Sequence, residues 1–346
     1  MKTLKWITGI ALMSIFSLTS CQSEVDEVEG DNPNTNTANS TTATNLKRVA
    51  MFDGSSDDFI DGSSCSALKF PFIAKVNGVS LTFISQLSFE QAISILGELN
   101  NNDDTVEIKF PVTLKMSDYT EVTVNSQAEY DAIVNNCEEA ENDGEAAISS
   151  LDIKYPITIL TYDASLEQTG SVVITSQEQM YNYMINISST EYFSVKYPIS
   201  VTLADGSSEE LNSDAELKAS ITAALNIESS MDEAAEDKEE LEEILVNGTF
   251  KVNSFINAGA NLTSTYLNYT IDFANDWKIK SMNALSTIAT GTYKVTSDTE
   301  LYLQFGFAGS TDFSLFNNTW KVISFTDTTI TLESKTNSAV KLILKK

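Results

Sequence analysis

The stretch Lys109-Phe110-Pro111-Val112-Thr113-Leu114-Lys115-Met116-Ser117-Asp118 shows the pattern that organises the first two thirds of the chain. Its apolar residues alternate with polar ones after the proline, as in an antiparallel strand with one buried face. Ser117-Asp118 then predicts the turn of a hairpin. The same Lys-aromatic-Pro tripeptide occurs four times, with prolines 40, 45 and 42 residues apart, at Lys69-Phe70-Pro71, Lys109-Phe110-Pro111, Lys154-Tyr155-Pro156 and Lys196-Tyr197-Pro198. Such a spacing is typical of an internal repeat.

A helix is predicted at the end of each repeat. Capping boxes of the form Ser-x-x-Glu/Gln begin at Ser88, Ser126, Ser176 and Ser213, and this pattern marks helix N-termini. The sequence therefore predicts an α+β region of four ββα repeats, arranged as two ββαββα modules over residues 63–137 and 151–227. An acidic linker, residues 138–150, separates them.

The Lys-aromatic-Pro tripeptide allows two interpretations. The aromatic residues could form an exposed platform that binds glycans. Alternatively, each aromatic packs into the core and each proline fixes the entry to a strand. Because the tripeptide recurs at one topological position in all four repeats, we favour the second interpretation.

From residue 247 onward the sequence consists of short alternating strands. Eight runs are predicted, near 248–254, 266–273, 277–282, 289–296, 300–306, 319–325, 328–334 and 339–345. They predict an all-β domain over residues 247–346, an eight-stranded antiparallel barrel.

This last domain resembles the lipocalin-like domains that end many Bacteroidetes-type lipoproteins. The resemblance covers about the last 100 residues and is carried by Gly248-Thr249-Phe250, Gly291-Thr292-Tyr293 and Trp320-Lys321-Val322-Ile323. It implies a ligand cavity inside the barrel. However, lipocalins open with Gly-x-Trp where this chain has Phe250, and eight strands enclose little more than their own side chains. We therefore expect aromatic side chains to fill the interior, with an apolar ligand site as the alternative. The aromatic residues expected to point inward are Phe250, Phe273, Trp277, Tyr293, Phe305 and Trp320.

The N-terminus predicts export and lipidation. Residues 1–20 combine Lys2 and Lys5 with an apolar stretch of signal-peptide length, and Leu18-Thr19-Ser20-Cys21 resembles a bacterial lipobox. The resemblance implies that Cys21 is acylated and anchors the protein in the outer membrane, with an ordinary secretory signal as the alternative. Polar residues follow, so residues 21–62 are predicted to be a flexible tether. The acidic start of this tether resembles the surface-export signals of Bacteroidetes-type lipoproteins.

Two further cysteines, Cys65 and Cys137, lie at the two ends of the first module. In an exported chain such an even pair predicts a disulfide. A nucleophilic or metal-binding thiol is the alternative, but the chain contains no histidine to accompany it.

The chain is strongly acidic, with 49 acidic against 21 basic residues and a net charge of −28. This charge argues against nucleic acid as a partner. The most acidic segment, residues 228–246, has apolar residues at helical spacing and is predicted to be a solvated linker helix. Calcium binding is the alternative for acidic segments, although Asp57, Asp58 and Asp61-Gly62 do not match the calcium-loop pattern.

These observations predict a non-enzymatic lipoprotein that needs no cofactor or metal and attaches to the membrane through Cys21. It would act as an interaction or structural module with a protein or glycan partner. A lipocalin-like binder of a small apolar ligand and a hydrolase that uses two carboxylates are the alternatives.

Overall fold

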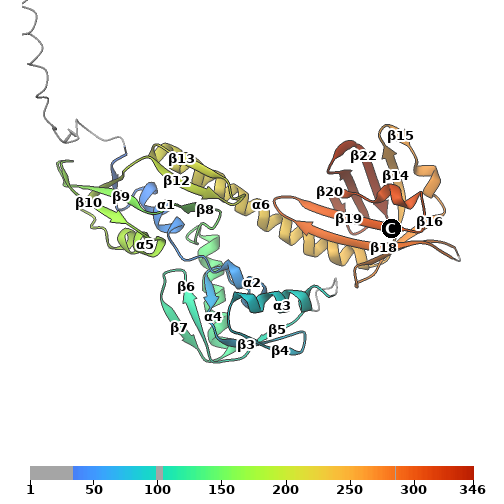
Figure 1. Ribbon diagram of the computed structural model, residues 1–346, viewed down its shortest axis with the longest axis horizontal. Helices are drawn as coiled ribbons and strands as arrows, with labels where there is room; N and C mark the ends of the chain where they lie inside the picture. The colour runs from blue at the N-terminus through green and yellow to red at the C-terminus, as the bar shows by residue number, and fades with distance from the viewer. Residues whose placement is uncertain (1–33, 99–103, 285) are drawn as a thin grey trace, which may run out of the picture.

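The computed structural model describes residues 34–98, 104–284 and 286–346. It contains two α+β modules and a β barrel (Figure 1). The second module and the barrel lie at opposite ends of the long helix α6 (Asp214–Val246), and the first module lies to one side of this helix. Each body has its own cluster of buried apolar side chains.

The first module consists of two three-stranded sheets that exchange a strand. Its strands are β2 (Ser66–Leu68), β3 (Phe72–Val76), β4 (Val79–Phe83), β5 (Val106–Ile108), β6 (Val112–Met116) and β7 (Glu121–Val124). The sheet orders are β4-β3-β5 and β2-β6-β7. Each sheet therefore combines a hairpin that follows one proline with the short strand that precedes the other proline, so neither half is complete without its neighbour.

The second module repeats this exchange. Its strands are β8 (Leu151–Ile153), β9 (Ile157–Tyr162), β10 (Gln168–Ile174), β11 (Tyr192–Val195), β12 (Ile199–Leu203) and β13 (Ser208–Leu211). They form sheets of order β1-β11-β9-β10 and β13-β12-β8, and β1 (Asn36–Thr37) adds an edge strand from the N-terminal segment. The order in each half is thus a short strand, a hairpin and a helix, one strand more than the predicted ββα unit.

The four Lys-aromatic-Pro tripeptides lie between the short strand and the hairpin, and all four aromatic–proline bonds are cis. Their aromatic side chains are partly buried against the module cores. Phe70, for example, stacks on Phe72 with ring centroids 5.6 Å apart, and the Tyr197 hydroxyl donates to Asp214 Oδ1 at 2.6 Å. The interpretation that the aromatic residues pack against the core is therefore confirmed, in preference to the exposed platform.

All four capping boxes precede helices as predicted, and in three of them the serine side chain caps the helix: α4 (Gln127–Asn142), α5 (Gln177–Asn186) and α6. At α4 the backbone N–H of Glu129 donates to Ser126 Oγ at 3.3 Å. At the remaining box, Ser88, helix α3 (Phe89–Leu96) also starts where predicted, but the serine side chain does not cap it. A 3₁₀ turn, η2 (Gln86–Ser88), precedes α3, and the Ser88 hydroxyl accepts from Ile84 N instead of capping the helix.

The predicted tether over residues 21–62 is wrong from Asn34 onward, because this segment is folded. It contains α1 (Thr41–Val49), η1 (Ser55–Asp57) and α2 (Asp58–Asp61). Three apolar residues of α1 recur at helical spacing and are buried in the second module: Ala43, Leu46 and Val49. Because most other residues of this segment are polar, its composition does not reveal these three apolar residues, which the second module covers. Residues 21–33 lie outside the described residues.

Both predicted linkers differ from the structure. Helix α4 continues to Asn142, so the segment 138–150 begins as helix. The segment 228–246 is helical as expected, but it continues without a break from the helix of the second module. One continuous helix therefore joins the second module to the barrel.

The C-terminal domain is a closed barrel of eight main antiparallel strands, as predicted. These are β14 (Thr249–Asn257), β16 (Tyr269–Phe273), β17 (Lys278–Asn283), β18 (Ser286–Ser297), β19 (Leu301–Ala308), β20 (Thr319–Thr326), β21 (Thr329–Ser334) and β22 (Asn337–Lys345). Pairing of β14 with β22 closes it, and β15 (Ala260–Asn261) extends β14 as a short hairpin. Short 3₁₀ turns, η3 (Thr263–Tyr266) and η4 (Phe313–Phe316), connect strands at its ends.

Gly291 of the Gly-Thr-aromatic motif has a packing role. A Cβ atom at this position would lie 2.1 Å from the carbonyl oxygen of Gly306 on the neighbouring strand. Only glycine therefore allows β18 and β19 to approach this closely.

Candidate functional site

The barrel interior is the place where a lipocalin-like ligand would bind, and side chains fill it. Five of the six aromatic residues predicted to point inward are at most 3% exposed, and Trp277 is half-buried against the same cluster. Trp320 is fully buried, and its indole N–H donates to the Phe316 carbonyl at 2.9 Å. Further aromatic residues join this core: Phe255, Tyr266, Phe307, Phe313 and Phe316.

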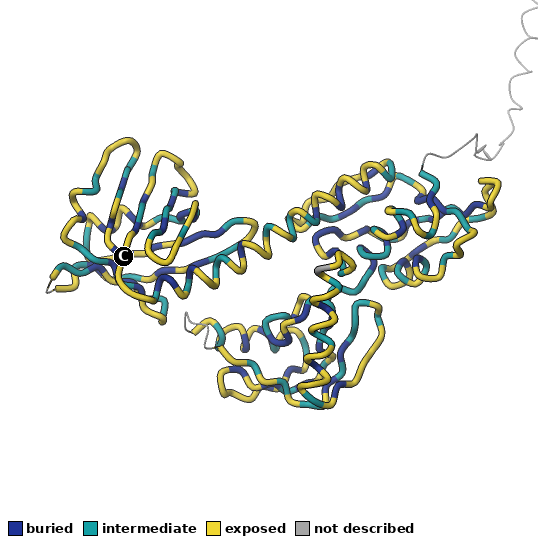
Figure 2. Tube along the Cα trace, turned by 180° about the vertical axis from the view of Figure 1, so that it is seen from behind, coloured by how far each residue is buried: buried dark blue, intermediate teal, exposed yellow. Residues whose placement is uncertain are grey.

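Helix α6 covers part of the barrel with three apolar residues. Leu241, Ile244 and Leu245 are buried in the same core as the barrel aromatics. Figure 2 shows that the last turns of this helix are buried where they meet the strands, whereas its middle is largely exposed. The helix is therefore part of the barrel domain at one end and part of the second module at the other.

The predicted disulfide is present. Cys65 and Cys137 are bonded, with their Cα atoms 5.8 Å apart. The bond joins the loop before β2 to helix α4 and closes a segment of 72 residues. Neither sulfur is therefore a free nucleophile or metal ligand.

Three carboxyl groups lie beside this disulfide in the segment that was predicted to be flexible. Asp57 and Asp61 are 1% and 6% exposed. Asp57 Oδ2 accepts from Leu68 N at 2.7 Å, and Asp61 Oδ1 accepts from Ser63 N at 3.1 Å. Asp58 Oδ2 accepts from the Ser64 hydroxyl at 2.6 Å. The second oxygen of each of these three groups is buried without a hydrogen-bond partner.

Burial controls the protonation of this acidic cluster. It raises the pKa of Asp57 to about 6 and that of Asp61 to about 9, and the negative charge of Asp57 adds to the second shift. Desolvation has this effect because it disfavours the charged carboxylate. Asp61 is therefore protonated at neutral pH and carries no charge.

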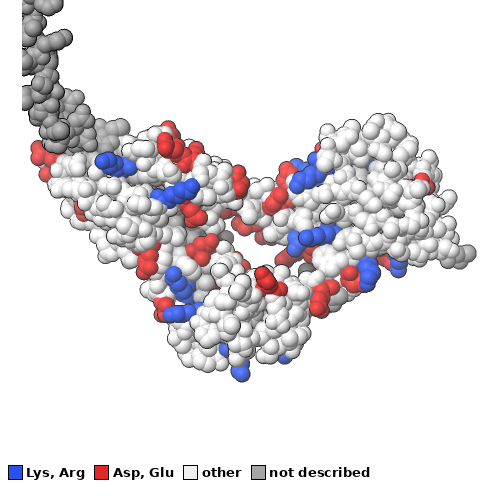
Figure 3. Space-filling view, in the orientation of Figure 1, with Lys and Arg blue, Asp and Glu red and all other residues white. Residues whose placement is uncertain are grey.

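A cleft of about 780 Å³ separates the two modules next to this cluster. Among the described residues, five acidic side chains and a single basic one, Arg48, line it; the acidic ones are Asp53, Asp58, Glu141, Glu228 and Asp232. Arg48 Nε donates to the Ala146 carbonyl at 2.8 Å. Burial, together with the charges of Asp232 and Asp58, raises the pKa of Glu141. Figure 3 shows acidic side chains gathered where the three bodies approach one another.

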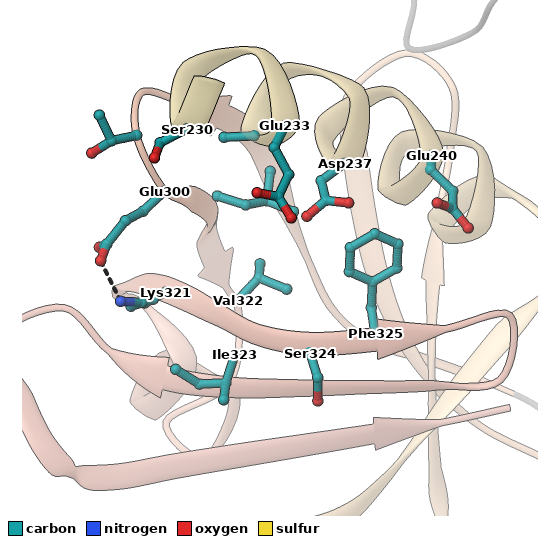
Figure 4. A pocket seen from close by; sticks show the side chains of 13 residues that line it. Ser230, Glu233, Asp237, Glu240, Glu300, Lys321, Val322, Ile323, Ser324 and Phe325 are labelled. Carbon is teal, nitrogen blue, oxygen red and sulfur yellow. Dashed lines mark hydrogen bonds and ion pairs between the residues drawn. The ribbon is translucent and has the colours of Figure 1, made fainter. Parts of the chain in front are cut away.

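A second groove, of about 460 Å³, lies between α6 and the barrel (Figure 4). Glu233, Asp237 and Glu240 project from the helix toward β20, which contributes Lys321 to Phe325. Lys321 forms an ion pair with Glu300, so its charge is already compensated. We refer to this feature as the helix–barrel groove.

The described residues include neither a cluster of metal-ligating side chains nor a helix that could span a membrane. No three acidic or cysteine side chains among them converge closely enough to hold a metal ion. No described helix is long and apolar enough to span a bilayer. Cys21 and the signal segment 1–20 lie outside the described residues.

Sequence reasoning missed both clefts. The acidic residues that line the cleft between the modules come from segments far apart in the chain, so no local motif signals it. The acidic wall of the helix–barrel groove comes from the single segment 228–246, but strand β20, which faces it, lies far along the chain. The repeated Asp-Gly-Ser-Ser at residues 53–56 and 61–64 could have indicated that this segment is ordered. Comparisons with known protein families, with curated proteins and with solved structures find no match for this chain.

Proposed function

We propose that this protein is a non-enzymatic, lipid-anchored lipoprotein of the cell envelope that acts as a surface interaction or structural module. The observation that carries the proposal is the packed interior of the barrel. A lipocalin-like carrier needs an apolar cavity, whereas here Trp320 and its aromatic neighbours occupy that space. The barrel therefore serves as a rigid support, and binding takes place on outer surfaces.

The remaining parts of the proposal rest on the sequence. Acylation of Cys21 would attach the chain to the outer membrane, and the acidic residues after it would direct the protein to the outer face. The four strand–hairpin–helix segments would be copies of one repeat. A protein or glycan partner would bind at the modules or at the acidic clefts, and the net charge argues against nucleic acid.

Membrane attachment is tested by Cys21→Ser in the cell of origin. The variant should move from the membrane fraction to the soluble fraction or accumulate as the unprocessed precursor. Surface exposure is tested separately: protease added to intact cells should digest the wild type. Cys65→Ser, which leaves the lipobox intact, is the control and should stay in the membrane fraction. Membrane retention and normal processing of Cys21→Ser would refute the anchor.

The interaction role is tested against the carrier role with a fluorescent long-chain fatty acid titrated into the full mature chain. We expect no saturable binding by the wild type. Saturable binding at one site per chain would favour the lipocalin-like carrier instead.

The cleft between the modules favours one second candidate, a carboxylate-based hydrolase. Glu141 and Asp232 line this cleft, and the pKa of each is raised by desolvation and by neighbouring carboxylates. Such pairs can divide into an acid and a base. If the cleft is catalytic, the wild type should release reducing sugar from envelope polysaccharides and Glu141→Gln should not. The proposed interaction role predicts no release by either protein.

A further inference from the structure

Strand β20 has an edge that its neighbours do not fully cover. It pairs with β21 from Trp320 to Thr326, with a bulge at Ile323, but with β19 only over Thr319, Trp320 and Lys321. Because β19 begins only at Leu301, it does not extend along the part of β20 that follows Lys321. Within the described part of the chain, Val322–Thr326 therefore has a sheet partner on one side only.

This uncovered edge borders the helix–barrel groove. Val322, Ile323, Ser324 and Phe325 line the groove, and Figure 4 shows α6 running across from them with an open space between. A strand edge carries unpaired backbone N–H and C=O groups, which is the arrangement that accepts an added strand. Ile323 is 49% exposed, so the edge also offers apolar contact.

The opposite wall of the groove is acidic. Glu233, Asp237 and Glu240 occur at spacings of four and three residues on α6, so they lie on one face of the helix. The same helix is buried in the second module through Leu217 and in the barrel through Leu241 and Leu245. The carboxylates are thus held at a fixed distance from the strand edge.

We propose that the helix–barrel groove binds an extended lysine- or arginine-rich segment of a partner polypeptide, which pairs with β20 as an additional strand. This inference rests on the proposed interaction role and names the chemistry of the partner. The backbone of the segment would pair with Val322–Thr326. Its basic side chains would meet the carboxylates of α6, and its apolar ones would cover Ile323, which Figure 4 shows pointing away from the helix.

Charge selects this occupant over the other candidates. A second copy of the chain would bring the same carboxylates into the groove, and like charges would repel. Lys321, which lines the groove, is already paired with Glu300. A segment with an alternating pattern of basic and apolar residues satisfies both walls, because successive side chains of a strand point to opposite faces.

The probe for this proposal is a fluorescent peptide of about nine residues that alternates lysine with valine, a typical strand length. Its affinity for the full mature chain is measured by fluorescence anisotropy. The groove variant is Asp237→Asn with Glu240→Gln. The matched control is Glu236→Gln with Glu239→Gln, which removes the same charge from exposed positions of the same helix that do not line the groove.

We expect the groove variant to raise the Kd about tenfold, as the loss of two partly exposed ion pairs implies. The control should change it by less than about twofold, since only long-range attraction is lost. Equal weakening by both variants, or no binding by the wild type, would overturn the proposal.

Strand pairing is tested by methylating backbone nitrogens of the peptide. In an added strand, only every second backbone N–H donates a hydrogen bond to β20. Methylation of the nitrogens that face β20 should therefore abolish binding, whereas methylation of the intervening nitrogens should leave binding unchanged. Equal effects of the two peptides would rule out strand addition. The fatty acid titration distinguishes failure of this inference from failure of the proposed function. If the peptide does not bind and fatty acid does not bind either, only the groove proposal is refuted. If fatty acid binds, the proposed interaction role itself is refuted.

Discussion

At the residue scale, the unusual groups are the two buried carboxyls of the first module. Asp57 and Asp61 bind backbone N–H groups with one oxygen each, and the other oxygen is buried without a partner. Their burial is energetically costly when they are charged. The pKa of each is raised, so folding favours the protonated form. These two residues should make the first module sensitive to pH.

We predict that Asp61→Asn weakens this sensitivity. Between the unfolded pKa of 3.8 and the folded value of about 9, the folded chain retains a proton that the unfolded chain releases, so stability falls as pH rises. The wild-type melting temperature should therefore drop between about pH 5 and pH 8 more steeply than that of Asp61→Asn, which stays neutral throughout. Calorimetry at several pH values measures this.

The exposed Asp205 provides the control for this measurement. Its pKa is lowered by hydrogen bonds to Ser207, so it titrates below the tested range, and Asp205→Asn should leave the wild-type slope unchanged. A variant Asp61→Asn with the full wild-type slope would contradict the assignment.

Residue-scale features differ in how far they could be predicted. The pairing of Cys65 with Cys137 follows from the two cysteines that remain once Cys21 is assigned to the lipobox, and the burial of Trp320 follows from strand alternation; both are present. The burial of Asp57 and Asp61 could not be predicted, because nothing local indicates that their segment packs beneath β2 and α4.

At the element scale, α1 is the clearest departure from the sequence prediction. Its composition is that of a tether, but Leu46 is fully buried in the second module. The Ser40 hydroxyl accepts from Ala43 N at 3.1 Å and caps the helix. The helix exists because the second module covers its one apolar stripe, which is a tertiary effect.

We predict that Leu46→Ala destabilises the second module by about 2–5 kcal/mol, the usual cost of removing a fully buried leucine side chain. Chemical denaturation of the full chain measures the change. Thr44→Ala, at an exposed position of the same helix, should change the stability by less than about 0.5 kcal/mol. Equal stabilities of Leu46→Ala and wild type would show that the segment is a tether after all.

Helix α6 connects two bodies, and a break in it should uncouple them. Ala235 is exposed near the middle of this helix. Proline at this position removes a helical hydrogen bond and costs about 3 kcal/mol, whereas glycine costs about 1 kcal/mol. We predict that Ala235→Pro broadens the distribution of distances between spin labels on the second module and the barrel, and that Ala235→Gly retains the wild-type distribution. An unchanged distribution in Ala235→Pro would contradict the rigid connection.

Elements with strong local patterns were predictable. The alternation of apolar and polar residues locates all eight main barrel strands, and the four capping boxes locate helix starts. The short strands that precede each proline were not predicted, because strands of three or four residues carry no clear period. Their exchange between sheets is set by tertiary pairing, which local patterns do not encode.

At the scale of the whole molecule, the division into two modules and a barrel could be predicted from the change in sequence pattern near residue 247. The contacts between the bodies could not. Trp277 of the barrel, for example, donates its indole N–H to the Gly97 carbonyl of the first module at 3.1 Å. Such contacts join residues far apart in the chain, and the two acidic clefts arise in the same way.

The central claim is that the barrel interior is a packed core and not a ligand cavity. The measurement that tests it most directly is denaturant unfolding of the full mature chain, wild type against Trp320→Ala, with and without a long-chain fatty acid. Trp320→Phe, which keeps most of the aromatic volume, is the control and guards against a variant that fails to fold. We predict that Trp320→Ala loses about 3–5 kcal/mol, that Trp320→Phe loses less, and that fatty acid does not change the wild-type stability. Near-native stability of Trp320→Ala, together with stabilisation of the wild type by fatty acid, would contradict the claim and identify the barrel as a carrier.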